Sequence, residues 1–204
     1  MSGEVLHRTT EAYDHIARRF SDRWFDNPVM EPFLDRFIAL VRGRGTVADV
    51  GCGPGRDAAY LIRNGVPAIG IDPSGNMLNE ARRNTPQLPC VRADCRQLPL
   101  RGRSLVGIWA CASILHVPRP EFPQVLAEFA RVLDRGYLFV ALKEGQGHRW
   151  LCLDAEHERF FVYYSVDEVE DALDRSGFEV LEFTRNEDES SQDTWINFYA
   201  RLRT

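Results

Sequence analysis

Three glycines follow a short apolar run near residue 50 in a pattern that is typical of a nucleotide-binding turn. The run Val47–Val50 predicts a buried strand, and Gly51, Gly53 and Gly55 separate it from a helical stretch that begins near Asp57. Glycine lets the backbone approach a ligand closely and adopt positive φ angles, which such strand-to-helix turns require. The glycines therefore predict a ligand site at the end of this strand.

Two charged residues beside the glycines narrow the choice of ligand. A dinucleotide fingerprint needs glycine, or at least alanine, at position 56, and this chain has Arg56 there. Asp49 lies two residues before the first glycine, where its carboxylate would repel a pyrophosphate bound at the helix N-terminus. An ammonium group would be attracted instead, so the turn favours a cationic ligand.

A second carboxylate, Asp72, tests that interpretation. It ends the apolar run Ala68–Ile71, about twenty residues beyond the glycines, which is the place of a ribose-binding carboxylate. A carboxylate there is able to accept hydrogen bonds from both ribose hydroxyls. The predicted ligand therefore carries a ribose and a positive charge and needs no phosphate.

These motifs resemble those of the class I S-adenosylmethionine-dependent methyltransferases, and the resemblance runs from about Tyr13 to the C-terminus. It is carried by the glycine motif Asp49–Gly55, the ribose motif Ile69–Ser74 and the adenine motif Ala93–Cys95, which precedes Leu98-Pro99. Residue types, order and spacing all agree with the family. The resemblance implies that S-adenosyl-L-methionine is the cofactor and S-adenosyl-L-homocysteine the product.

The resemblance also implies which residues contact that cofactor. Asp49 and the glycine backbone would hold the methionine moiety, Asp72 the ribose and Asp94 the adenine amino group. The implied set is Tyr13, Asp49, Gly51, Cys52, Gly53, Asp72, Pro73, Met77, Ala93, Asp94, Cys95 and Ala110. Taken singly, each motif also has an ordinary structural interpretation, such as a strand-to-helix turn or a core methionine. Their combination favours the cofactor site.

The N-terminal segment Tyr13–Ala17 resembles a Tyr-Asp-x-x-Ala segment of related small-molecule enzymes, in which the tyrosine covers the cofactor. The first helix would then be part of a lid, with Arg18 or Arg19 reaching the methionine carboxylate. The alternative is an amphipathic helix that simply buries Tyr13.

His116 is the candidate catalytic residue. It follows the predicted strand Leu105–Ala110, in a loop that resembles one closing over the methionine end of the cofactor in many small-molecule members. As a general base it would serve an oxygen or protonated nitrogen acceptor. As a capping or core histidine it would order the loop before Pro118. Many relatives carry paired histidines and an acidic residue at the start of this strand, whereas this chain has one histidine and Val106-Gly107, so both roles stay open.

Aromatic residues are concentrated in the variable segment 143–161 and just beyond it. They are His148, Trp150, His157, Phe160, Phe161, Tyr163 and Tyr164, and Trp24 and Phe25 lie between the first two helices. Such a composition predicts either a pocket for a flat or apolar small molecule or an ordinary core. The cofactor motifs leave open whether the methyl acceptor is oxygen, nitrogen, sulfur or carbon.

Composition narrows the function classes further. With 204 residues and 44% hydrophobic content the chain is expected to form one domain, and its net charge of −5 argues against a nucleic-acid substrate. Its five cysteines form no C-x-x-C pair and no signal segment is apparent, which predicts a cytoplasmic protein with reduced thiols. No apolar run is long enough to span a bilayer, and the scattered histidines predict no metal site. Oligomeric state is not readable.

Strand-like and helix-like segments alternate along the chain, which predicts helices on both faces of a parallel sheet. We expect a single domain over 1–204, with an N-terminal helical cap at 1–44 and a core at 45–204. The cap is predicted as two helices, Glu4–Arg19 and one opened by Asn27-Pro28. The core strands are predicted at Val47–Val50, Ala68–Ile71, Cys90–Ala93, Leu105–Ala110, Tyr137–Leu142, Phe178–Thr184 and Thr194–Leu202.

The last two predicted strands form a terminal hairpin, joined by the polar stretch Asn186–Asp193 and preceded by a helix with a capping box at Ser165 and Glu168. A methyltransferase fold has such a hairpin and a dinucleotide-binding domain ordinarily lacks it. By resemblance, the fold class is α/β, a three-layer Rossmann-like methyltransferase fold with a seven-stranded, mostly parallel sheet of order 3-2-1-4-5-7-6, the seventh strand antiparallel.

The sequence therefore predicts a methyltransferase that acts on a small molecule by in-line transfer. A catalytically silent domain that binds the cofactor as a sensor or a partner subunit is the alternative, since intact cofactor motifs do not separate the two. A nicotinamide-dependent dehydrogenase is opposed by Asp49, by Arg56 and by the terminal hairpin.

Overall fold

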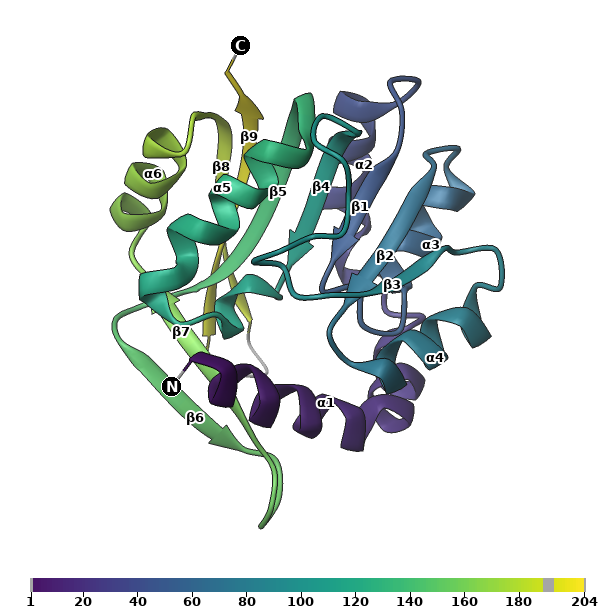
Figure 1. Ribbon diagram of the computed structural model, residues 1–204, viewed down its shortest axis with the longest axis vertical. Helices are drawn as coiled ribbons and strands as arrows, with labels where there is room; N and C mark the ends of the chain where they lie inside the picture. The colour runs from purple at the N-terminus through teal and green to yellow at the C-terminus, as the bar shows by residue number, and fades with distance from the viewer. Residues whose placement is uncertain (1, 189–192, 204) are drawn as a thin grey trace.

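A mixed β-sheet with helices on both faces forms the body of the protein (Figure 1). The structure is a computed structural model that describes residues 2–188 and 193–203. The strands are β1 Val47–Val50, β2 Ala68–Asp72, β3 Cys90–Arg92, β4 Leu105–Cys111, β5 Leu133–Glu144, β6 His148–Cys152, β7 Glu158–Tyr164, β8 Phe178–Asp188 and β9 Asp193–Leu202.

The order of the core strands confirms the prediction. Strands β3, β2, β1, β4 and β5 pair in parallel in that order, β9 pairs antiparallel with β5, and β8 pairs antiparallel with β9. Counted without β6 and β7, this is 3-2-1-4-5-7-6 with an antiparallel seventh strand. Of the predicted polar stretch between the last two strands, residues 189–192 lie outside the described part of the chain.

Strands β6 and β7 are additional to the seven predicted. They form an antiparallel hairpin inside the variable segment 143–161 and just past it, and β7 joins the end of β5 through Lys143 and Glu144. Lys143 pairs with Trp195 of β9 on its other edge, so β7 takes the edge of β5 beyond the end of β4. The sequence did not predict the hairpin because its aromatic residues fit a pocket lining or a core equally well.

Six α-helices and three short 3-10 turns complete the described fold. The helices are α1 Ser2–Trp24, α2 Glu31–Val41, α3 Arg56–Arg63, α4 Gly75–Asn84, α5 Phe122–Val132 and α6 Val166–Arg175, and the turns are η1 Pro28–Met30, η2 Ile114–His116 and η3 Arg119–Glu121. The predicted capping box at Ser165 and Glu168 is present at the start of α6. None of the helices in the described part is long and apolar enough to cross a membrane.

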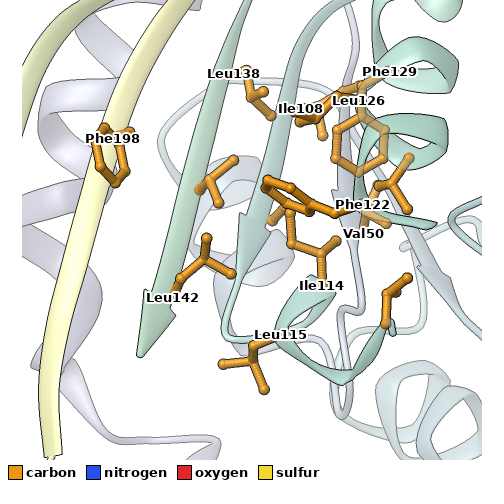
Figure 2. Close-up of a cluster of buried hydrophobic side chains, with 14 of the residues drawn as sticks. Val50, Ile108, Ile114, Leu115, Phe122, Leu126, Phe129, Leu138, Leu142 and Phe198 are labelled. Carbon is orange, nitrogen blue, oxygen red and sulfur yellow. The ribbon is translucent and has the colours of Figure 1, made fainter. Parts of the chain in front are cut away.

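Successive residues of the central strands face opposite sides of the sheet, and both sides are covered. Figure 2 shows Ile108 of β4 and Leu138 of β5 in one core cluster with Phe122 and Phe129 of α5. Trp109, the neighbour of Ile108 on β4, belongs to the cluster on the other face, where it packs with residues of α2 and α3. Burial on both faces explains why these strands are continuously apolar in sequence.

Helix α1 crosses the end of the sheet where the parallel strands finish (Figure 1). The Asp14 carboxylate accepts hydrogen bonds from Ser74 Oγ at 2.5 Å and from the backbone N–H of Asn76 at 2.9 Å, which fasten the helix to the start of α4. Nearer the N-terminus, Thr9 Oγ1 accepts from the backbone N–H of Phe160 on β7 at 3.2 Å. The helix therefore bridges two segments about 85 residues apart in sequence.

Candidate active site

A cavity of about 1220 Å³ lies at the carboxyl ends of the parallel strands, with residues of α1 in its wall. His116 and all the predicted cofactor residues except Ala110 line it. Binding sites in open α/β sheets occupy this end of the strands, near the point where the strand order reverses. The volume exceeds that of a pocket for one drug-sized ligand, so the cavity has room for a cofactor and a second small molecule.

Ala110 departs from the prediction. It is fully buried (0% exposed) in the core cluster on the α5 side of the sheet and does not line the cavity. Its successors Cys111 and Ala112 do, because β4 ends at Cys111 and the chain turns there into the loop over the cavity. The strand end in this structure lies one residue beyond the predicted one.

The glycine turn has the conformation that the sequence predicts. Gly51, Gly53 and Gly55 have φ angles of 76°, 52° and 83°, which L side chains rarely adopt. A Cβ on Gly51 would lie 2.1 Å from the Cβ of Ser113, so the loop after β4 requires the first glycine. A Cβ on Gly53 would meet only Met77 Sδ, at 4.0 Å. The space in front of Gly53 is therefore open toward the cavity.

Asp72 holds the glycine turn against the end of β2. Its two carboxylate oxygens accept from the backbone N–H groups of Gly53 at 2.9 Å and Ser74 at 2.8 Å. The side chain is 8% exposed, and burial raises its pKa to about 6 although both hydrogen bonds act in the opposite direction. Each oxygen keeps a second lone pair that a ligand hydroxyl is able to use.

Asp49 lies deeper in the same wall, at 2% exposure, and its Oδ2 accepts from the backbone N–H of Ala58 in the first turn of α3 at 3.1 Å. Burial, followed by the neighbouring Asp57 carboxylate, raises its pKa well above the usual range. Asp57, which sequence reasoning did not single out, pairs with Arg56 at 2.6 Å and accepts from the Trp109 indole N–H at 2.8 Å. A cation bound beside Asp49 would stabilise the ionised form of this buried carboxylate.

Asp94 lines the cavity, and its carboxylate is bonded to Arg96, a partner that the motif did not predict. Arg96 donates to its carboxylate through Nε at 2.9 Å and also forms an ion pair with Glu121. Cys95, between them, lines the cavity as predicted. An adenine amino group at Asp94 would share the carboxylate with Arg96, and this contact stays a prediction.

Tyr13 and His116 form a hydrogen-bonded pair across the cavity. The Tyr13 hydroxyl lies 2.9 Å from His116 Nε2, and His116 Nδ1 lies 2.5 Å from the Phe160 carbonyl oxygen. A carbonyl only accepts, so Nδ1 carries the proton and Nε2 accepts from the tyrosine hydroxyl. Three segments distant in sequence therefore determine the tautomer of His116.

The imidazole of His116 is neutral near physiological pH. Burial, together with the positive charges of Arg159 and Lys143 and against the effect of the Phe160 carbonyl, lowers its pKa to about 4. Burial also raises the pKa of the Tyr13 hydroxyl, against the effect of Arg159. The pair is thus a neutral unit in which the tyrosine keeps its proton and donates a hydrogen bond to Nε2.

The predicted aromatic pocket is present in part. Phe161 and Tyr163 of β7 and Trp24 line the cavity, whereas Phe160 faces the other side of β7 and packs against Trp150 with ring centroids 5.1 Å apart. Successive side chains of a strand point to opposite faces, which explains why Phe161 and Tyr163 face the cavity and Phe160 does not. The other predicted aromatic residues, Phe25, His148, His157 and Tyr164, do not line it. Trp195 of β9, which sequence reasoning missed, does.

Of the two arginines of α1 that were predicted to reach the methionine carboxylate, only one lines the cavity. Arg19 lines the cavity, but Arg18 does not and instead bonds to Asp22 at 3.1 Å. Tyr13 belongs to a small apolar cluster with Ile16 and Met77, and it also lines the cavity. Its contact with the methionine portion of the cofactor stays a prediction.

Three residues that the sequence left scattered meet at the edge of the site. His15 of α1 and His157 stack with ring centroids 4.0 Å apart, and both bond to Asp154, at 3.2 Å and 2.9 Å. Their ligand atoms lie within 4.8 Å of one another, a grouping that is able to hold a metal ion. The expected absence of a metal stays a prediction. The contact itself joins α1 to the β6–β7 turn.

Comparisons with known proteins agree with this geometry. Residues 47–136 match the protein-family model of the methyltransferase domain. A ubiquinone/menaquinone biosynthesis C-methyltransferase of Campylobacter jejuni is 35% identical over 104 residues, which cover 48% of this chain and 43% of that protein. The chain spans about half the length, or less, of the curated relatives it matches.

Solved structures share the fold at low sequence identity. The 1,6-didemethyltoxoflavin-N1-methyltransferase of Burkholderia thailandensis, solved with 1,6-didemethyltoxoflavin and S-adenosylhomocysteine, is 19% identical with a TM-score of 0.81, over 100% of this chain and 91% of that one. The cyclase SpnF is 18% identical with a TM-score of 0.68, over 85% of this chain and 81% of that one. The predicted resemblance to class I methyltransferases is confirmed.

Alanine substitutions separate the glycine that the fold requires from the one that faces the cavity. Gly43→Ala serves as the control, because Gly43 has φ 71° with nothing within 4 Å of an added Cβ. We expect Gly43→Ala and Gly53→Ala each to lower the free energy of unfolding by about 1–2 kcal/mol, the cost of left-handed backbone. Gly51→Ala must also displace Ser113 and should cost clearly more. Urea denaturation measures all three, and equal losses would contradict the assignment.

The protonation state of His116 gives a second prediction. Its pKa of about 4 in the folded state lies below the ordinary value of 6.5, so the imidazole should stay in the Nδ1–H form from pH 8 down to about pH 5. The contribution of the neutral His116 imidazole to the free energy of unfolding is fully present above pH 6.5 and is lost as the pH falls toward 4. Nitrogen-15 NMR of labelled histidines measures the tautomer and the titration midpoint of His116 directly. A midpoint near pH 6.5 for His116 would show that the imidazole is not buried in this way.

Proposed function

We propose that this chain, which carries a class I S-adenosylmethionine-dependent methyltransferase domain, transfers a methyl group from S-adenosyl-L-methionine to a small molecule. The observation that carries the proposal is the convergence of Asp49, the open face of Gly53 and Asp72 on one wall of a cavity whose other wall holds the Tyr13–His116 pair. Our proposed domain organisation is a single domain with residues 1–44 as the cap.

The residues present fit that cofactor. Asp72 offers two acceptor oxygens for ribose hydroxyls, and Gly53 leaves room for close approach of a ligand to the backbone. Asp49 would face the cationic methionine end. Ser113 Oγ is buried at this cavity without a hydrogen-bond partner, so a ligand polar group would satisfy it. These residues all lie on the wall of the cavity that the glycine turn forms, which we call the glycine wall.

The cofactor supplies a methyl group on a sulfonium, and a nucleophile that attacks the methyl carbon releases a neutral thioether. The protein then contributes chiefly by aligning the acceptor, and proximity of this kind is worth roughly 7–11 kcal/mol. His116 would accept the proton of an oxygen or nitrogen acceptor, directly or through the Tyr13 hydroxyl. Helix α1, fastened through Asp14, would exclude water.

A small-molecule acceptor is supported by the enclosed shape of the site and by the relatives. The cavity is walled by Phe161, Tyr163 and Trp195 and covered by α1, which suits a compact planar molecule better than a polymer. Two of the proteins named above are, by their names, a 1,6-didemethyltoxoflavin methyltransferase and a methyltransferase of ubiquinone/menaquinone biosynthesis.

Titration calorimetry with S-adenosylhomocysteine tests the cofactor assignment. Asp72 has a pKa of about 6 in the ligand-free protein, so affinity should fall roughly tenfold between pH 8 and pH 5 as the carboxylate takes up a proton. Asp72→Asn should bind at least about tenfold more weakly at pH 8, since a charge-assisted contact is worth about 1.5–3 kcal/mol. It should also lose the step near pH 6.

Failure of the cofactor-free wild-type protein to bind S-adenosylhomocysteine would overturn the proposal. Tight binding of NAD in its place would revive the dehydrogenase interpretation. Persistence of the pH 6 step in Asp72→Asn would assign that step to another group, such as Asp49.

Product formation separates the enzyme from a catalytically silent binding domain. The cyclase SpnF shares the fold, so the fold alone does not decide the reaction. We expect methyl transfer to at least one class in a panel of phenols, amines and thiols, measured by mass spectrometry. With a phenol, His116→Ala should lower kcat about a hundredfold, while a thiolate acceptor should lose far less. Cofactor binding without any product would favour the sensor or partner role.

A further inference from the structure

We propose that Arg159 recognises an anionic group, in particular a carboxylate, on a planar acceptor molecule. The inference rests on the proposed function and specifies its substrate class. It starts from a guanidinium that faces the cavity without an acidic partner.

Arg159 belongs to the hairpin that the sequence did not predict. It alternates along β7 with Phe161 and Tyr163, so all three side chains line the cavity, while Phe160 and Val162 face away. The guanidinium carbon lies 5.4 Å from the centre of the Tyr13 ring and 5.3 Å from that of Phe161. Cation–π contacts on both sides therefore hold the charge in place.

The guanidinium interacts with the Tyr13 hydroxyl, whose pKa it lowers against the larger effect of burial, but in the described part of the chain it lacks the carboxylate partner that neighbouring cations have. Arg159 Nε is buried without a hydrogen-bond acceptor, and within residues 2–188 and 193–203 no ion pair links this side chain to a carboxylate. Lys143 in the same wall bonds to Asp193 at 2.6 Å, and Arg8 pairs with Glu158 beside Arg159 in sequence. A buried donor that is left unsatisfied in the free protein is restored when a ligand oxygen binds it.

Charged residues of both signs line the cavity, and several of them form ion pairs with one another, such as Arg56 with Asp57 and Lys143 with Asp193. Of the lining residues without an ion pair in the described part of the chain, Asp49 and Asp72 lie on the glycine wall, and Arg149 and Arg159 lie on the wall formed by the hairpin. The glycine wall suits the cationic cofactor, and the hairpin wall suits an anion. The planar fork of arginine matches a carboxylate with two parallel hydrogen bonds, and the flanking aromatic rings favour a flat molecule.

The position of Arg159 relates this anchor to the reacting groups. The carbonyl of its neighbour Phe160 accepts a hydrogen bond from His116 Nδ1–H, and the guanidinium of Arg159 lies against the Tyr13 ring. A carboxylate held by Arg159 would therefore place the acceptor beside the Tyr13–His116 pair. The cofactor carboxylate is the other candidate occupant, but Arg159 lies on the added hairpin, whereas Arg19 of the covering helix also lines the cavity.

Matched acids and amides test the assignment on protein saturated with S-adenosylhomocysteine. Three pairs of planar compounds suit the cavity: salicylate, 1-hydroxy-2-naphthoate and quinoline-2-carboxylate, each with its neutral carboxamide. We expect calorimetry to show at least one acid binding about tenfold to a hundredfold more tightly than its amide. Arg159→Gln should reduce that preference to less than about twofold, and Arg159→Lys should keep part of it. Affinity for S-adenosylhomocysteine should stay within about twofold of wild type in both variants.

Arg149→Gln is the control, because Arg149 lines the same cavity but is exposed and stacks on Tyr163 at 5.4 Å. An equal loss of preference in both glutamine variants would overturn the assignment to Arg159. So would failure of all three acids to bind at millimolar concentration, or no preference for acid over amide. A loss of S-adenosylhomocysteine binding confined to Arg159→Gln would assign the residue to the cofactor carboxylate instead. If the wild-type protein does not bind S-adenosylhomocysteine at all, the proposed function itself fails.

Discussion

The carboxylate of Asp72 connects the segments from which the cavity is built. It accepts from the backbone of Gly53 in the turn after β1 and of Ser74 at the start of α4. Ser74 in turn donates to Asp14, so one chain of hydrogen bonds runs from the glycine turn to the covering helix. Burial of a charge without a cationic partner is costly, which is why the pKa of Asp72 rises to about 6. A ligand that donates to this carboxylate offsets part of that cost.

The Tyr13–His116 pair closes the cavity in a similar way from the other side. His116 links the loop after β4 to the backbone of β7, and Tyr13 links that loop to α1. Because the imidazole is neutral and its tautomer is set by the Phe160 carbonyl, Nε2 is unprotonated and accepts the hydrogen bond of the Tyr13 hydroxyl. The structural and catalytic roles that the sequence left as alternatives are therefore compatible in one residue.

The charges around the cavity show how little the net charge of a chain says about its site. The protein carries −5 overall, yet Arg149 and Arg159 line the hairpin wall of the cavity without an ion pair in the described part of the chain, opposite the buried carboxylates of Asp49 and Asp72. Such an arrangement would orient two different ligands in one space. The sheet makes it possible, since β1 and β2 end on one side and the added β6–β7 hairpin covers the other (Figure 1).

Much of the cofactor wall and of the core fold could be predicted from the sequence. The glycine turn and the positions of the core strands depend on local backbone requirements and on periodicity, which a single sequence displays directly. The order of the seven core strands came from the resemblance to the methyltransferase family, and the structure confirms it. The His15–Asp154–His157 contact and the pairing of Tyr13 with His116 could not be predicted, because each joins residues far apart in the chain. The β6–β7 hairpin is local, but the sequence did not predict it because its aromatic residues fit a pocket lining or a core equally well. The sequence by itself indicated where carboxylates for a ribose and a cation would lie, because Asp49 and Asp72 each lie in a short apolar strand at a recognisable distance from the glycines. Only the tertiary structure decided which side chains of the hairpin face the cavity, because strand alternation on β7 turns Arg159 and Phe161 inward and Phe160 outward, and that register is set by strand pairing.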